Sequence, residues 1–178
     1  MQSGLLLLVQ SSYGGVATTP RWITDATRPD NCGNRFETMP AKGIHHVDLA
    51  VADVERSLAF YLDLLGPLGW AEGIRYPTYR GTEEVVYLAR GEVRDGGLGL
   101  RPADGGTYRY YDVGVEHIAF EVDRREDVDE AHARCLASGA NVHFPPEEDR
   151  DEPGYYAFFV FDPDGIRVEV FCWPRSES

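Results

Sequence analysis

Three side chains that commonly bind metals stand in segments with a strand-like pattern: His46, His117 and Glu169. His46 opens "HVDLAV" and His117 opens "HIAFEV", two segments in which apolar residues alternate. Successive residues of a strand face opposite sides of the sheet, so each histidine faces away from the large apolar residues of its segment. Glu169 lies likewise opposite the valines of "IRVEVFC". Imidazole and carboxylate groups bind divalent metals, so the sequence predicts a metal site at these three residues.

Two histidines and one carboxylate hold a divalent ion on one side and leave positions open for water or substrate. A carboxylate within an apolar strand is costly unless it is paired or bound to a metal. The alternative is that each histidine is an ordinary polar strand residue and that Glu169 pairs with an arginine. The repeated position of the two histidines favours the metal site. His45 and His143 are weaker candidates, the first because it has the opposite parity to His46.

The elements around these residues follow one order twice. The first copy predicts a strand over 46–51, a helix from residue 54 to the Gly66-Pro67 pair, and strands near 70–76, 83–90 and 96–102. Asp53 is placed to cap that helix at its amino end. The second copy predicts a strand over 117–122, a helix within 125–140, and strands near 141–144, 154–161 and 166–172. The second helix shows an apolar stripe, which we expect to be buried: Val128, Ala131, Cys135 and Leu136.

This order indicates an α+β fold of two tandem βαβββ modules that form a cupped mixed sheet with helices on its outer face. We expect a single domain over 41–175, with module one at about 43–102 and module two at about 113–173. Residues 1–40 have no periodic pattern and are rich in Gly, Ser, Thr and Pro, which predicts a disordered leader. The "DPDG" segment over 162–165 predicts a hairpin turn rather than a calcium loop.

Composition excludes several classes of partner. The formal net charge of −13 argues against nucleic acid, whose phosphates need a basic surface. No apolar run approaches the ~18 residues that a membrane span requires. The three cysteines are widely spaced and form neither a zinc motif nor a disulfide framework. We therefore expect a cytoplasmic protein whose partner is a small-molecule substrate.

Longer segments carry a family resemblance. "HHVDLAVADVERSLAFYLDLLG", "VEHIAFEVDRREDVDEAHARCLASGA" and "FDPDGIRVEVF" resemble the vicinal oxygen chelate superfamily, which includes glyoxalase I, extradiol dioxygenases, methylmalonyl-CoA epimerase and the fosfomycin and bleomycin resistance proteins. The resemblance covers residues 43–173. It implies a cup around a divalent ion (Fe2+, Mn2+, Zn2+ or Ni2+) with His46, His117 and Glu169 as ligands.

The resemblance also implies an activity. We expect a metal-dependent lyase or dioxygenase of the glyoxalase or extradiol type, acting on a small substrate with vicinal oxygens. Tyr155 or Tyr156 would orient the substrate or donate a proton, and Glu121 is a candidate general base. Glyoxalase-like members carry a fourth ligand in the last strand of the first module. Here that strand is "GGLGLRP", where Gly99 or a neighbouring leucine offers no ligand.

Two alternatives remain open from the sequence. Drug-binding members of the superfamily keep the cup without the ligands, so a non-catalytic protein of the bleomycin-resistance type is the competing function. An acidic chain would suit a cationic drug. The third possibility is a structural or regulatory homodimer, because the superfamily's cups often form between subunits.

Overall fold

The structure is a computed structural model that describes residues 43–78, 81 and 83–173. Module 1 contains β1 (His46–Val51), α1 (Val54–Leu65), η1 (Gly66–Leu68), β2 (Ala71–Pro77), β3 (Glu84–Ala89), η2 (Val93–Asp95) and β4 (Gly97–Pro102). Module 2 contains β5 (His117–Val122), α2 (Arg125–Ser138), β6 (Asn141–Glu148), β7 (Tyr156–Phe161) and β8 (Arg167–Cys172). The two tandem βαβββ modules are thus confirmed. The predicted leader at 1–40 lies outside the described residues.

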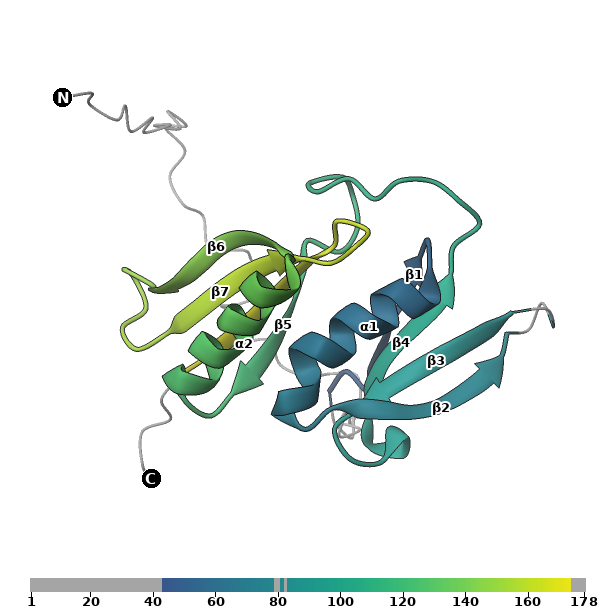
Figure 1. Ribbon diagram of the computed structural model, residues 1–178, viewed down its shortest axis with the longest axis horizontal. Coiled ribbons are helices and arrows are strands. Elements are labelled where there is room, and N and C mark those ends of the chain that lie inside the picture. Colours follow the sequence, from purple (N-terminus) through teal and green to yellow (C-terminus); the bar gives the residue numbers. More distant parts are fainter. Residues whose placement is uncertain (1–42, 79–80, 82, 174–178) are drawn as a thin grey trace, which may run out of the picture. The chain divides into compact units, whose positions relative to one another are not determined.

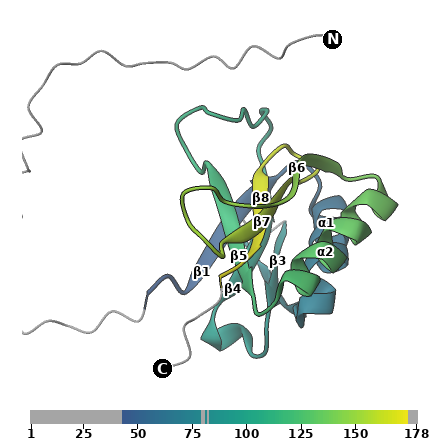
Figure 2. The same cartoon turned by 90° about the vertical axis from the view of Figure 1, so that its left-hand side faces the viewer.

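Each module builds its own four-stranded mixed sheet, with the order β1-β4-β3-β2 in module 1 (Figure 1) and β5-β8-β7-β6 in module 2. The first strand of each module pairs in parallel with the last, and the remaining pairs are antiparallel. Figure 2 shows α1 and α2 on the same side of the strands. The opposite face of each sheet is therefore covered by neither α1 nor α2. In the described part of the chain, no helix is long and apolar enough to cross a membrane.

The alternation of burial along the first strands confirms the predicted parity. In β1, Leu49 and Val51 are buried, whereas His46 and Asp48 on the other face are exposed. The following helix begins as predicted, because the Asp53 carboxylate accepts a hydrogen bond from the backbone N–H of Arg56 at 3.0 Å. Such a cap satisfies one of the free donors at a helix start. The sequence pattern thus places both the strand face and the helix start correctly.

The structure differs from the sequence-based prediction in two details. Leu136, which we expected on the buried stripe of α2, has 59% of its surface exposed. Each helical residue turns about 100°, so Leu136 lies well around the helix from Val128, Ala131 and Cys135, which are buried. Strand β6 extends to Glu148 rather than ending near residue 144. It is the edge strand of its sheet, and an edge strand tolerates prolines and bulges.

The two modules meet chiefly through α1. Arg134 on α2 forms an ion pair with Asp63 on α1, with Nη2 and Oδ1 2.7 Å apart. Asp164, in the turn between β7 and β8, accepts from Arg56 at 2.6 Å and from the backbone N–H of Ala52 at 3.0 Å. Buried apolar side chains of both modules join in one core cluster. The predicted "DPDG" turn therefore also docks module 2 onto module 1.

Candidate metal site

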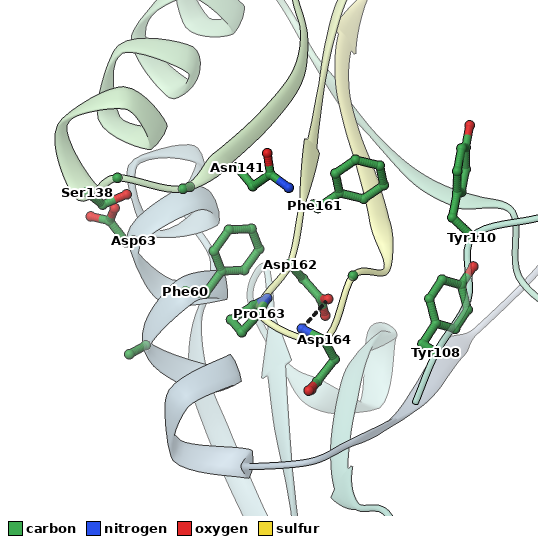
Figure 3. Close-up of a pocket in the computed structure, with 14 residues that line it drawn as sticks. Phe60, Asp63, Tyr108, Tyr110, Ser138, Asn141, Phe161, Asp162, Pro163 and Asp164 are labelled. Carbon is green, nitrogen blue, oxygen red and sulfur yellow. Dashed lines mark hydrogen bonds between the residues drawn. The ribbon is translucent and has the colours of Figure 1, made fainter. Parts of the chain in front are cut away.

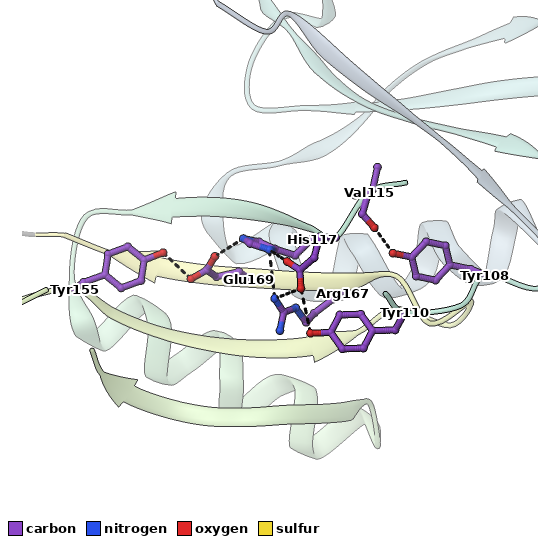
Figure 4. A network of polar contacts seen from close by, with 8 residues as sticks. Tyr108, Tyr110, Val115, His117, Tyr155, Arg167 and Glu169 are labelled. Atoms are coloured by element: carbon purple, nitrogen blue, oxygen red, sulfur yellow. Dashed lines mark hydrogen bonds and ion pairs between the residues drawn. The ribbon is translucent and has the colours of Figure 1, made fainter. Parts of the chain in front are cut away.

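A histidine–glutamate pair lies on the free face of module 2. The parallel register of β5 and β8 places Ala119 opposite Glu169 and His117 opposite Arg167. His117 Nε2 and Glu169 Oε2 are 3.1 Å apart (Figure 4). The side chain of Glu169 is only 4% exposed, against 34% for that of His117. Its other oxygen, Oε1, accepts from the Tyr155 hydroxyl at 2.6 Å, so the carboxylate is fixed in orientation.

Hydrogen bonding decides which nitrogen of His117 carries the proton. Nδ1 of His117 contacts the carboxylate of Glu116, which also accepts from Arg167 and, at 3.1 Å, from the Tyr110 hydroxyl. The hydrogen bond from His117, followed by those from Arg167 and Tyr110, lowers the pKa of Glu116 to about 2. An ionised carboxylate only accepts, so Nδ1 must donate. In the neutral form of His117 the lone pair is therefore on Nε2, facing Glu169, whereas a protonated ring would donate to both carboxylates.

The pair fits a divalent ion. A lone pair on His117 Nε2 and a carboxylate oxygen repel each other unless a proton or a cation lies between them. Two ligands at right angles, each ~2.1 Å from one ion, would lie about 3.0 Å apart. The observed separation of 3.1 Å is close to that value. His117 and Glu169 are therefore suitable in donor type, orientation and spacing for one metal ion.

Neutral His46 has the same tautomer as neutral His117, but a histidine rather than a carboxylate binds its Nδ1. Nε2 of His45 lies 2.9 Å from the carbonyl oxygen of Arg94, so His45 donates from Nε2. Nδ1 of neutral His45 is then an acceptor, and it lies 3.0 Å from Nδ1 of His46, which must donate. His46 Nε2 therefore carries a lone pair. His46 also lines a cavity of about 700 Å³, together with Tyr76 and Tyr87.

The three predicted ligands do not meet within one chain. Among residues 43–78, 81 and 83–173, no three His, Cys, Asp or Glu side chains form a group that could hold a metal ion. The structure brings His117 and Glu169 together, whereas His46 contacts His45 and the ring of Tyr87. The three-ligand site therefore stays a prediction, and the sequence pattern does not decide whether two modules of one chain or of two chains would form it. Strand parity predicts the face of a side chain but not the separation of two modules.

The two candidate tyrosines lie on opposite faces. The Tyr155 hydroxyl contacts Glu169, but the Tyr156 hydroxyl donates to Asp129 of α2 at 2.8 Å. Tyr156 thus lies on the helix side and away from the pair, which corrects the expectation that it serves the site. Adjacent residues of an extended segment face opposite ways, which explains the difference. Glu121 has the parity of His117 but is four residues further along β5, roughly 13 Å away at the rise of a strand.

Sequence reasoning missed the residues that hold His117. Arg167 is packed against two rings, with its guanidinium carbon 4.9 Å from the centre of Tyr110 and 4.6 Å from that of Phe159. Its contact with Glu116 links these rings to the histidine. The sequence offers one sign of these residues: a polar residue directly precedes each first-strand histidine, Glu116 before His117 and His45 before His46. That signal becomes meaningful only when the hydrogen bonds are known.

A separate cavity of about 830 Å³ lies on the helix side (Figure 3). It is bounded by α1, the end of α2, the β7–β8 turn and the segment before β5. Four aromatic side chains line it: Phe60, Tyr108, Tyr110 and Phe161. Tyr110 also donates to Glu116, so this residue is common to the cavity and to the network around His117.

Comparisons with known proteins agree with the fold. The profile of the Glyoxalase/Bleomycin resistance protein/Dioxygenase superfamily matches residues 43–170. "Uncharacterized protein YqjT" of Bacillus subtilis (strain 168) is 31% identical over 137 residues, which cover 71% of this chain and 96% of that protein. A glyoxylase/bleomycin resistance protein/dioxygenase domain from Frankia sp. EAN1pec superposes with a TM-score of 0.62 at 25% identity, covering 76% of this chain and 100% of that one.

Two further solved structures have named activities or ligands. Lactoylglutathione lyase from Agrobacterium tumefaciens has a TM-score of 0.54 at 26% identity, covering 75% of this chain and 95% of that one. A point mutant of the fosfomycin resistance protein FosX from Listeria monocytogenes, in complex with Mn(II) and 1S,2S-dihydroxypropylphosphonic acid, has a TM-score of 0.55 at 20% identity, covering 74% of this chain and 92% of that one. FosX shares the fold with this chain, and it shows that a protein of this fold binds a divalent metal.

Proposed function

The chain belongs to the Glyoxalase/Bleomycin resistance protein/Dioxygenase superfamily, and we propose that it is a metal-dependent enzyme acting on a small substrate with two adjacent oxygens. The observation that carries this proposal is the 3.1 Å pair of His117 Nε2 and Glu169 Oε2. A carboxylate this deeply buried normally needs a cation, and the imidazole nitrogen facing it is in the tautomer that binds metals. The reaction would be of the lyase or dioxygenase type.

His117 and Glu169 would hold a divalent ion such as Fe2+, Mn2+, Zn2+ or Ni2+, and His46 would supply a third ligand. The bound ion would provide Lewis acidity toward the two substrate oxygens. Tyr155 would hold Glu169 in position through the 2.6 Å hydrogen bond to Oε1. Burial, and then that hydrogen bond, raise the pKa of Tyr155, so its hydroxyl stays protonated and continues to donate.

We propose that His46 comes from a second copy of the chain. Within the part of one chain that is described, His46 does not join His117 and Glu169, so one chain offers an incomplete site. A symmetric dimer would pair module 1 of each copy with module 2 of the other and form two sites. The proposal also includes a cytoplasmic location, which suits the free thiols of Cys135 and Cys172.

Metal analysis of the purified protein tests the function. We expect close to one divalent ion per chain, with much less in Glu169→Gln and His46→Ala. Retention of stoichiometric metal by both variants would contradict the proposed site. Glu84→Gln is the matched control, because it removes one exposed carboxylate at the start of β3.

Mixing two defective variants tests the dimer. His46→Ala and His117→Ala chains, unfolded together and refolded, would form mixed dimers in which one of the two sites has all its ligands. We expect the mixture to regain about a quarter of the wild-type metal, as random pairing of symmetric dimers predicts. No recovery in a mixture that contains mixed dimers would mean that each site is built within one chain.

A non-catalytic small-molecule binding protein is the second candidate. The aromatic-lined cavity of about 830 Å³ favours it, because its volume suits a drug-sized ligand (Figure 3). The metal analysis separates the two candidates. A protein that binds organic ligands but no stoichiometric metal would have this second function.

A further inference from the structure

The two modules carry a carboxylate at the same cross-strand pair but on different strands. In module 2, Glu169 on β8 lies opposite Ala119 on β5. In module 1, Gly99 on β4 lies opposite Asp48 on β1. Both pairs are two residues beyond the first-strand histidine, His46 or His117, and on its face of the sheet. The internal repeat therefore makes Asp48 the module 1 counterpart of the Glu169 carboxylate.

Gly99 provides the space that Asp48 occupies. A Cβ atom built on Gly99 would collide with the carboxylate of Asp48 and would lie 2.9 Å from Cε1 of Tyr87. The Asp48 carboxylate thus lies over the position where a side chain at residue 99 would project. In module 2 the arrangement is reversed, because Ala119 has only a methyl group and Glu169 has the long side chain. Each pair has one carboxylate and one small partner.

The surroundings of the two carboxylates also correspond. Tyr87 lies opposite Gly99, and Phe159 lies opposite Glu169. Their rings meet the histidines edge-on, with centroids 6.0 Å apart for His46 and Tyr87 and 5.8 Å for His117 and Phe159.

A tyrosine hydroxyl binds one oxygen of each carboxylate. Tyr87 donates to Asp48 Oδ2 at 3.2 Å, and Tyr155 donates to Glu169 Oε1 at 2.6 Å. The other oxygen of Asp48, Oδ1, lies over Gly99, and the other oxygen of Glu169, Oε2, lies 3.1 Å from His117 Nε2.

We propose that Asp48 is a fourth protein ligand of the metal, acting with His46 as the module 1 half of the site. This inference rests on the proposed function, because it adds a ligand to the ion held by His117 and Glu169. His46 and Asp48 are two residues apart on one strand, so their side chains project from the same face. Two imidazoles and two carboxylates would give the site a net charge of −2 toward a divalent ion, and would leave two of six positions for substrate oxygens.

A titration with Mn2+ alone tests the proposal. Binding is measured as the decrease in the EPR signal of free Mn2+. Asp48→Asn keeps the size of the side chain and an acceptor for Tyr87 but removes the charge. We expect it to weaken Mn2+ binding by at least about tenfold, the lower end of the cost of losing even a residue that only positions a ligand. Glu84→Gln should bind Mn2+ like the wild type.

Moving the carboxylate to the other strand is the sharper test. Asp48→Ala should lose affinity as Asp48→Asn does, and the double variant D48A/G99E should regain most of it. Removing the Asp48 side chain relieves the closest collision at residue 99, and the ring of Tyr87, 2.9 Å from the Cβ position, must then shift slightly to admit the glutamate. Thermal unfolding of each variant confirms that it is folded before titration.

The outcomes separate the two proposals. If Asp48→Asn and Asp48→Ala bind Mn2+ like the wild type while Glu169→Gln does not, Asp48 is not a ligand and the three-ligand site stands. If Glu169→Gln also binds like the wild type, the proposed function itself fails. Recovery in D48A/G99E with loss in D48A supports the fourth ligand, because a purely structural role of Asp48 would not be restored from β4.

Discussion

Module 1 and module 2 share an order of elements and a strand register but fix their histidines differently. His117 donates to a carboxylate, Glu116, whereas His46 donates to another imidazole, His45, which in turn donates to a backbone carbonyl. In the neutral form of either histidine, both arrangements put the lone pair on Nε2. The comparison teaches that both modules direct the proton of the neutral histidine to Nδ1 and keep Nε2 available to a metal. The residue that accepts the hydrogen bond from Nδ1 differs between the modules.

The modules also differ in how they bury the carboxylate. Glu169 as a whole residue is only 3% exposed, whereas Asp48 is exposed to solvent. Glu169 is therefore the residue that most needs a cation, since an unpaired buried charge is costly. Asp48 in water has no such need. Module 2 is accordingly expected to be the principal metal-binding half, and module 1 the complementing half.

The largest expected effects test whether the modules unfold together. Phe158 in β7 and Leu100 in β4 are both fully buried in the shared core cluster. We expect Phe158→Ala to lower the free energy of unfolding by about 3–5 kcal/mol and Leu100→Ala by about 2–5 kcal/mol. Urea denaturation should show one transition shifted by either change. Leu136→Ala on the exposed face of α2 is the matched control, expected within ~0.5 kcal/mol. Two separate transitions would show that the modules are independent.

The next effect compares the metal-linked stability of the two halves. At a Mn2+ concentration of 100 times its Kd, the wild type should gain about 2.7 kcal/mol in the free energy of unfolding. Glu169→Gln should gain almost none at that concentration, because it removes the buried ligand of module 2. Urea titrations with and without Mn2+ measure both values. If Mn2+ raised the free energy of unfolding equally in the wild type and in Glu169→Gln, module 2 would not be the principal metal-binding half.

A smaller effect compares the helix starts. Asp53 caps α1 through its side chain, whereas Arg124 at the start of α2 makes no capping hydrogen bond. Asp53→Ala should cost about 1 kcal/mol. Arg124→Ala loses only an exposed ion pair with Asp127 and should cost less than about 0.5 kcal/mol. Equal costs in urea denaturation would contradict this reading of the two helices.

The smallest expected effect is the change with pH in the stability that Glu116 contributes. The pKa of Glu116 is lowered from 4.5 to about 2 in the folded protein. A lowered pKa means that ionised Glu116 stabilises the fold above pH 4.5, and that this contribution is lost as the pH falls from 4.5 toward 2. The stability difference between wild type and Glu116→Gln should therefore shrink over that range. A difference that is constant with pH would show that Glu116 is not held by His117, Arg167 and Tyr110. Module 1 has His45 at this position and lacks such a carboxylate.

The sequence by itself determined the duplicated βαβββ order, the faces of His46 and His117, and the capping of α1 by Asp53. These features depend on the two-residue period of strands and on contacts within one helical turn, so they can be read from neighbouring residues. Only the tertiary structure decided that Glu169 lies beside His117, that His46 does not join them within one chain, and that Tyr155 rather than Tyr156 serves the pair. It also decided that Asp48 fills the space over Gly99. These contacts depend on strand register and on the packing of one module against another, which bring together residues far apart in the sequence and leave no periodic trace in it.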